Sequence, residues 1–226
     1  HLKGVRVLDE RIPDEAGFPF DLPFVPGLDL EFRSGVTFFV GETGSGKSTV
    51  LDAIAALNGF PVTGGGKNET ADRVGLQESS SLAQALRPWW ARRPTDGYFF
   101  RAETLVEFAS LLDQRKTDPD FWGDPYQRYG GTSLHVRSHG EAFLALFENR
   151  LGDGLYLMDE PEAALSPQRQ LALLARMAEL VEAGRTQFII ATHSPILMTL
   201  PGAQIINFDD PALPDTRLAD TSHYQI

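Results

Sequence analysis

The segment Val40-Gly41-Glu42-Thr43-Gly44-Ser45-Gly46-Lys47-Ser48-Thr49 decides the fold of this 226-residue chain. It fits the pattern G-x-x-x-x-G-K-[ST], whose glycines let the backbone fold tightly and aim its N–H groups inward at a triphosphate. The apolar run 36–40 before it reads as a strand, and residues 50–57 after it read as a helix. Strand, loop and helix in this order predict a phosphate-binding loop at the positive end of a helix dipole.

The residues of this loop have separate expected roles. Lys47 is expected to reach the β- and γ-phosphates and to assist catalysis, and Ser48 is expected to ligate Mg²⁺. The predicted nucleotide-binding residues here are Gly41, Glu42, Thr43, Gly44, Ser45, Gly46, Lys47, Ser48 and Thr49.

Composition and charge limit the class of protein. Hydrophobic residues make up 42% and charged residues 23%, as in ordinary soluble domains. No apolar run of about 18 residues occurs, so no transmembrane segment is expected, and acidic residues near the start argue against a signal peptide. Cysteine is absent, which fits a cytoplasmic location.

The net charge of −11 makes the chain a poor non-specific binder of nucleic acid. One local exception is a cluster of arginines beside two tryptophans, for which a solvated surface with packed indoles is the favoured interpretation. The cluster consists of Arg87, Arg92, Arg93, Trp89 and Trp90.

The length of 226 residues allows about one to two domains. The family resemblance described below implies a single domain over residues 1–226, with residues 60–150 forming a helical lobe inserted in the core. The first 35 residues read as antiparallel strands and turns, residues 59–80 as turns, and residues 114–133 as a surface loop. Strands are expected at 98–100, 155–158 and 188–191, and helices at 103–113, 142–149 and 168–183. The last helix shows a stripe of Leu171, Leu174, Ala178 and Val181 and ends at Gly184. Strand, helix and strand in sequence predict a βαβ unit and a parallel sheet.

Polar residues follow the last two predicted strands. Asp159 and Glu160 end the run 155–158, and ligands bind at this edge of α/β sheets. Asp159 is expected to hold Mg²⁺ beside Ser48, and Glu160 to activate the attacking water. His193 ends the next strand and is expected to sense the γ-phosphate. The predicted catalytic residues are thus Lys47, Glu160 and His193, and the predicted metal ligands are Ser48 and Asp159.

This set resembles the ATP-binding-cassette (ABC) class of P-loop ATPases. Residues 41–48 resemble its Walker A motif, 155–160 its Walker B motif, 164–167 its D-loop and His193 its switch histidine. The sequences of residues 159–167 and 191–195 are similar to those of a bacterial group of small stand-alone ATPases that carry no transport subunit. The resemblance implies an α/β P-loop NTPase with a parallel core sheet, an N-terminal antiparallel β-subdomain and a short helical signature lobe. It also implies ATP and Mg²⁺ as ligands and an ATP-dependent homodimer.

The signature motif departs from the Leu-Ser-Gly-Gly-Gln of transporters, because residues 137–141 read Arg-Ser-His-Gly-Glu. Ser138 and Gly140 are retained and are expected to contact the nucleotide of a second subunit. Ser138 and Glu141 also form a capping box that opens the helix 142–149, so a structural and a functional role coexist.

Two other family positions stay open in the sequence. A glutamine that follows a strand is expected between the Walker motifs; Gln77 is one candidate, and the better-formed strand at 98–100 supplies Arg101 and Glu103 instead. Phe18 and Phe20 are candidates for stacking on adenine, or are core residues.

Two biological roles remain open for such an ATPase. One is a switch that acts on nucleic acid or on a protein partner, which the altered signature favours. The other is the nucleotide-binding subunit of a membrane ABC transporter.

Overall fold

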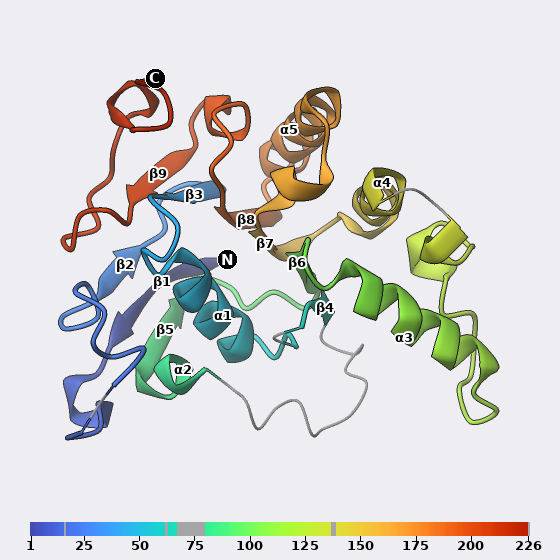
Figure 1. Ribbon diagram of the computed structural model, residues 1–226, viewed down its shortest axis with the longest axis horizontal. Coiled ribbons are helices and arrows are strands. Elements are labelled where there is room, and N and C mark those ends of the chain that lie inside the picture. Colours follow the sequence, from blue (N-terminus) through green and yellow to red (C-terminus); the bar gives the residue numbers. More distant parts are fainter. Residues whose placement is uncertain (16, 62, 67–79, 137–138, 226) are drawn as a thin grey trace.

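A six-stranded sheet forms the centre of the computed structural model, which describes residues 1–15, 17–61, 63–66, 80–136 and 139–225 (Figure 1). The strand order is β4-β6-β7-β8-β3-β9. The bounds are β4 (Gly65–Gly66), β6 (Gly97–Arg101), β7 (Gly154–Asp159), β8 (Thr186–Ala191), β3 (Val36–Val40) and β9 (Gln204–Asn207). Neighbours from β6 to β9 are parallel, and β4 pairs antiparallel with β6. The predicted parallel sheet is confirmed, and its central strands carry runs of buried apolar residues because both faces are covered.

A second, three-stranded antiparallel sheet has the order β2-β1-β5. Its strands are β1 (Leu2–Val7), β2 (Asp29–Glu31) and β5 (Leu86–Trp90). The sequence predicted strands in the first 35 residues but did not predict β5, which carries the tryptophan pair. Helices α1 (Lys47–Leu57) and α2 (Ser81–Ala85) share one apolar core with this sheet and with one face of the central sheet.

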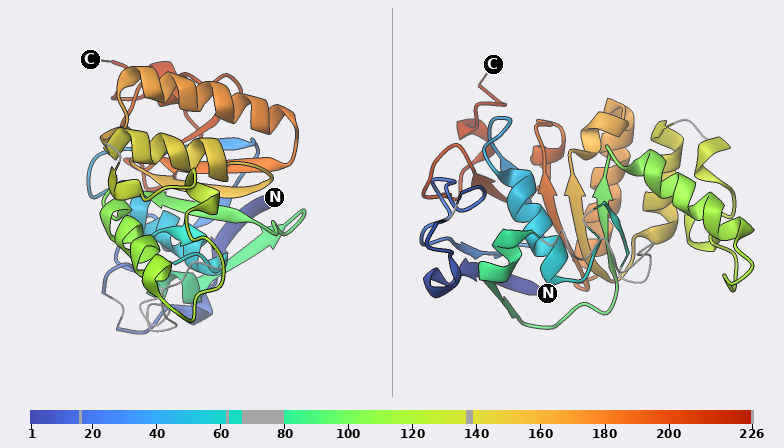
Figure 2. Two further views of the ribbon diagram at one scale, coloured as in Figure 1. Left: turned by 90° about the vertical axis from the view of Figure 1, so that its right-hand side faces the viewer. Right: turned by 60° about the horizontal axis from the view of Figure 1, so that its bottom comes forward.

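Three helices cover the opposite face of the central sheet: α3 (Leu105–Thr117), α4 (His139–Arg150) and α5 (Pro167–Glu182) (Figure 2). Side chains along β7 alternate between the two faces of the sheet and so contribute to the apolar core on each face. Leu155 and Leu157 face α1, whereas Tyr156 and Met158 face the three helices. The predicted class, an α/β P-loop fold with an antiparallel N-terminal subdomain and a helical lobe, is confirmed.

The buried stripe of α5 agrees only in part with the expected one: Leu174 is buried and Val181 packs against the core as predicted. The buried residues of the helix are Gln170, Leu173, Leu174 and Met177. Leu171 is 56% exposed, and Ala178 is exposed as well. Both stripes have helical spacing, so periodicity alone did not determine which one meets the sheet.

The segment 114–133 is more ordered than the expected surface loop. Helix α3 continues to Thr117, and a short helical turn (Gln127–Tyr129) buries the ring of Tyr129 against Tyr98 and Phe108. Further short helical turns span Asp9–Arg11, Leu134–Val136, Pro161–Ala164, Leu197–Thr199 and Leu218–Asp220. In the part of the chain that the structure describes, no helix has the length and apolarity needed to cross a bilayer.

Candidate active site

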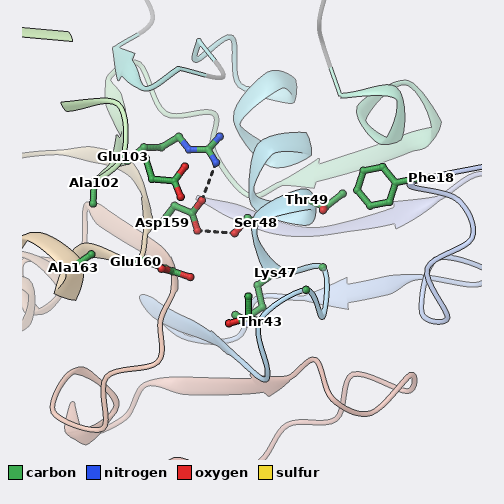
Figure 3. A pocket seen from close by; sticks show the side chains of 13 residues that line it. Phe18, Thr43, Lys47, Ser48, Thr49, Ala102, Glu103, Asp159, Glu160 and Ala163 are labelled. Atoms are coloured by element: carbon green, nitrogen blue, oxygen red, sulfur yellow. Dashed lines mark hydrogen bonds and ion pairs between the residues drawn. The ribbon is translucent and has the colours of Figure 1, made fainter. Parts of the chain in front are cut away.

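A pocket of about 380 Å³ lies where β6 and β7 end and α1 begins (Figure 3). This position is the carboxyl edge of the parallel strands, where α/β sheets bind ligands. The lining residues come from four separate stretches of the chain. They are Phe18, Thr43, Gly44, Gly46, Lys47, Ser48, Thr49, Arg101, Ala102, Glu103, Asp159, Glu160 and Ala163.

The loop between β3 and α1 has the backbone that its glycines predict. Gly41, Gly44 and Gly46 have φ of 141°, 85° and 94°, which side chains rarely tolerate. Lys47 is 4% exposed, and its Nζ donates to the carbonyl oxygens of Gly41 and Glu42 at 2.7 Å each. Burial lowers the pKa of Lys47, and neighbouring carboxylates oppose that change.

Ser48 and Asp159 meet at the base of the pocket. The Ser48 hydroxyl donates to Asp159 Oδ1 at 2.9 Å, although 111 residues separate the two in sequence. A hydroxyl and a carboxylate oxygen in contact are the hard ligands that Mg²⁺ prefers beside a triphosphate. The residues present therefore fit the expected metal.

Arg101, at the end of β6, binds two carboxylates at once. Its guanidinium lies 2.9 Å from Asp52 Oδ1 on α1 and 3.2 Å from Asp159 Oδ2 (Figure 3 shows the contact with Asp159). Burial raises the pKa of Asp159, and Arg101 is the largest influence in the opposite direction. The sequence offers Arg101 only as a substitute for the family's glutamine. Its ion pairs depend on the pairing of β6 with β7, where Arg101 lies beside Asp159.

Replacing Asp52 with asparagine is expected to stabilise the protein near neutral pH. Burial is the largest cause that raises the pKa of Asp52, from 3.8 to about 6. Between these values the folded state binds more protons than the unfolded state, so stability falls as pH rises and the loss is complete above about pH 6. The shift corresponds to about 3 kcal/mol, which we reduce to about 2 kcal/mol because 26% of the side chain is exposed.

Urea unfolding of the wild type and of Asp52→Asn near pH 4 and near pH 7.5 measures this effect. The gain is expected near pH 7.5 and should shrink near pH 4. The exposed Asp14→Asn is the matched control. An equal gain at both pH values contradicts the assignment to Asp52 ionisation.

Glu160 and His193 lie at adjacent strand ends. Glu160 has φ of 47°, an uncommon value for a residue with a side chain, and its N–H donates to the Ala191 carbonyl at 2.9 Å. This bond ties the end of β7 to the end of β8. Glu160 Oε1 and His193 Nε2 are 3.6 Å apart. The structure thus brings the predicted base and the predicted sensor together.

Two acidic residues near the site were missed in the sequence. Glu162 accepts the backbone N–H of His193 at 2.6 Å, and burial raises its pKa. Asp209, which follows β9, accepts the Glu42 N–H at 2.6 Å. Glu162 stands within the quoted motif and could have been flagged by its proximity, whereas nothing in the sequence relates Asp209 to a loop 167 residues away.

Not every predicted binding residue lines the pocket. Gly41, Glu42 and Ser45 support the loop: the Glu42 amide turns toward Asp209, and the Ser45 hydroxyl lies 3.3 Å from Lys47 Nζ. Thr43, Gly44, Gly46 and Thr49 do line it.

The signature residues lie apart from this pocket. Ser138 falls outside the described residues, so its predicted cap and contact carry no structural account. Gly140 is buried in the first turn of α4, where a side chain would meet Arg169 and the Ala164 carbonyl. Close packing within the subunit is therefore one reason for a glycine there.

Two open positions are partly resolved. Gln77 lies outside the described residues, and Arg101 and Glu103 line the pocket. Phe18 is 71% exposed at the pocket, whereas Phe20 packs against the core shared by α1 and the antiparallel sheet.

Comparison with known proteins adds independent information. A family model described as "AAA domain, putative AbiEii toxin, Type IV TA system" matches residues 141–199, and one described as "AAA domain" matches residues 23–83. The energy-coupling factor transporter ATP-binding protein EcfA2 of Streptococcus sanguinis is 28% identical over 199 residues, covering 79% of this chain and 68% of that protein.

Solved structures agree on the fold. An inward-facing metal-chelate type ABC transporter gives a TM-score of 0.52 at 16% identity, covering 88% of this chain and 79% of that one. The SMC head domain from Thermotoga maritima gives a TM-score of 0.51 at 16% identity, covering 96% and 98%.

A phosphate-binding loop, an acidic pair and a histidine on one edge of a parallel sheet define a P-loop nucleotide hydrolase. The sequence relatives and the fold narrow this class further: the chain is a P-loop ATPase of the ABC class.

Proposed function

We propose that the chain hydrolyses Mg²⁺-ATP with the residues that meet at this pocket. Lys47 and the amides of the loop bind the phosphates, Ser48 and Asp159 hold the metal, and Glu160 accepts a proton from the attacking water. His193 does not line the pocket itself but lies 3.6 Å from Glu160, and its proposed role is to sense the γ-phosphate from there. Bound Mg²⁺ supplies charge stabilisation for the phosphate oxygens. The observation that carries this proposal is the 2.9 Å contact between Ser48 and Asp159, with Glu160 next in sequence.

Phe18 is the proposed adenine contact. Its ring is largely exposed beside Thr49 at the pocket (Figure 3), where a planar base can cover it. Phe20 contributes to the core instead.

Two copies are proposed to close head to tail around two ATP molecules. Gly140, at the start of α4, does not line the pocket of its own chain. The helix N-terminus can therefore serve a phosphate only in the site of another copy. Glu160 is 47% exposed, which leaves the catalytic edge accessible to such a partner.

Glu160→Gln is expected to form a dimer when ATP and Mg²⁺ are present, because it retains the phosphate contacts but lacks the base. Size-exclusion chromatography with light scattering measures the mass, with ADP and with metal-free ATP as controls. A variant that binds ATP and stays monomeric contradicts the head-to-tail proposal.

For the output of the cycle, the comparisons favour a transporter more than a stand-alone switch. EcfA2 and an aliphatic sulfonates import protein, SsuB 2 of Streptomyces avermitilis, are both named as ATP-binding proteins of transport systems. We therefore propose that ATP-driven closure moves a membrane-domain partner. The stand-alone switch acting on a protein or nucleic acid is the second candidate, supported by the altered signature at 137–141.

The cluster of arginines and tryptophans offers a way to distinguish the transporter from a switch that acts on nucleic acid. Arg93 lies 5.9 Å from the Trp90 ring centroid, and Arg87 lies on β5 opposite Arg6. Co-purification of the Glu160→Gln trap with a permease supports the transporter. Salt-sensitive DNA binding that Arg92→Ala and Arg93→Ala abolish supports the switch instead.

A further inference from the structure

The C-terminal segment 218–225 places a second histidine against the switch histidine. His223 Nε2 and His193 Nδ1 are 3.0 Å apart, which is hydrogen-bond distance, and the ring centroids are 5.2 Å apart. The two residues come from stretches 30 positions apart and meet on the side of His193 away from Glu160. His223 was not among the residues that the sequence singled out.

This placement depends on a folded segment. The turn Leu218–Asp220 packs Leu218 against the core that α3, α4 and α5 share with the central sheet. Thr221 is 4% exposed, its hydroxyl donates to the Leu218 carbonyl at 2.8 Å, and it accepts the Tyr224 N–H at 3.1 Å. The His223 ring is therefore held in position by the backbone on both sides.

The hydrogen bond between the rings has a direction. A neutral imidazole has one nitrogen that donates and one that accepts. His193 Nε2 is buried without a hydrogen-bond partner among the described residues, and the nearest charged atom is Glu160 Oε1 at 3.6 Å. A carboxylate only accepts, so the favourable arrangement puts the hydrogen on His193 Nε2. Its Nδ1 then accepts, and His223 Nε2 must donate.

The second ring nitrogen of His223, Nδ1, fits the same order of donors and acceptors. With its hydrogen on Nε2, His223 accepts at Nδ1, and the Ser222 hydroxyl lies 3.4 Å from that atom. Ser222 to His223 to His193 to Glu160 is then a chain in which every donor faces an acceptor. The opposite tautomer of His193 would direct a lone pair at the Glu160 carboxylate.

The surroundings of His223 favour its neutral form. Burial lowers the pKa of His223, and His193 and Lys47 lower it further, while Glu42 and Asp209 oppose them. Glu160 faces His193 Nε2, and Glu162 holds its backbone N–H. Two protonated rings could not form this bond, since neither would have an acceptor.

We propose that His223 is a positioning residue that fixes the tautomer of His193, so that Nε2–H is directed at Glu160. The inference rests on the proposed role of His193 in hydrolysis. It makes the C-terminal segment part of the site: displacement of this segment by a partner would release the ring of His193 and slow the ATPase.

The test uses the full chain and two substitutions of different chemistry. His223→Leu removes the donor, whereas His223→Gln retains an amide N–H near the position of the ring Nε2–H. We expect kcat to fall about tenfold in His223→Leu, with KM for ATP nearly unchanged, and to recover within about threefold in His223→Gln. Tyr224→Leu, an exposed neighbour in the same segment, is the control and should match the wild type.

Nuclear magnetic resonance of nitrogen-labelled histidine reads the tautomer without any turnover. In the wild type, His193 should show a protonated Nε2 and an unprotonated Nδ1, and this state should be lost in His223→Leu and kept in His223→Gln. A protonated Nδ1 in the wild type, or the same tautomer in all three proteins, overturns the inference. A wild type that fails to hydrolyse ATP refutes the proposed function, whereas normal hydrolysis in His223→Leu refutes only the role of His223.

Discussion

Glu160→Gln is expected to lower the rate of ATP hydrolysis by about 10² to 10⁴ while leaving ATP affinity nearly unchanged. Glu160 lines the pocket at the end of β7, and glutamine has the same shape but cannot accept a proton from water. The residues proposed to hold phosphate and metal are Lys47, Ser48 and Asp159, whose own contacts the substitution leaves intact.

Single-turnover hydrolysis and ATP titration measure the two quantities separately. Glu182→Gln, at the exposed end of α5, is the matched control. A loss below about tenfold would mean that another carboxylate takes the proton. Glu103 is then the first candidate, since it also lines the pocket.

Lys47→Ala is expected to weaken ATP binding by about 100-fold, which is about 3 kcal/mol and typical of a charged hydrogen bond lost from a buried site. Lys47 Nζ is nearly enclosed by the loop and is surrounded by the carboxylates of Glu160, Asp209 and Asp159. Without the ammonium group, those carboxylates would repel the triphosphate with no compensating charge.

Isothermal titration with ATP and Mg²⁺ measures this affinity. Lys116→Ala, on the exposed part of α3, removes the same charge from the surface and should bind ATP as the wild type does. Circular dichroism checks that Lys47→Ala is folded. An affinity within about threefold of the wild type would show that the loop amides, and not Lys47, dominate phosphate binding.

Local features of the sequence predicted most of the framework. The strand, glycine loop and helix around residues 36–57 appear as expected, with α1 starting at Lys47, three residues before the apolar pattern. The strand ends at Asp159 and Ala191 were also predictable, because fully apolar runs bounded by polar residues indicate buried parallel strands. Parallel pairing of β7 with β8 then explains why Glu160 and His193 meet.

Features that depend on relative placement were not predictable in this way. Strands β5 and β9 lack a strong pattern of their own and exist through pairing with β1 and β3. Half of the predicted stripe of α5 was wrong, since Leu171 and Ala178 are exposed. The way the helix packs on the sheet decides which of its residues are buried. For the same reason, the sequence did not reveal the partners of the predicted catalytic residues.

The sequence by itself predicted a triphosphate site at residues 41–48 and an acid pair and a histidine that act on it, since backbone freedom, helix dipole and strand-end chemistry are local properties. Tertiary structure decided what surrounds those groups. Arg101 forms ion pairs with Asp52 and Asp159. Asp209 accepts the Glu42 N–H, and His223 lies within hydrogen-bond distance of His193. These contacts join residues from 30 to 167 positions apart. Their geometry follows from strand order and chain packing, which no short stretch of sequence contains.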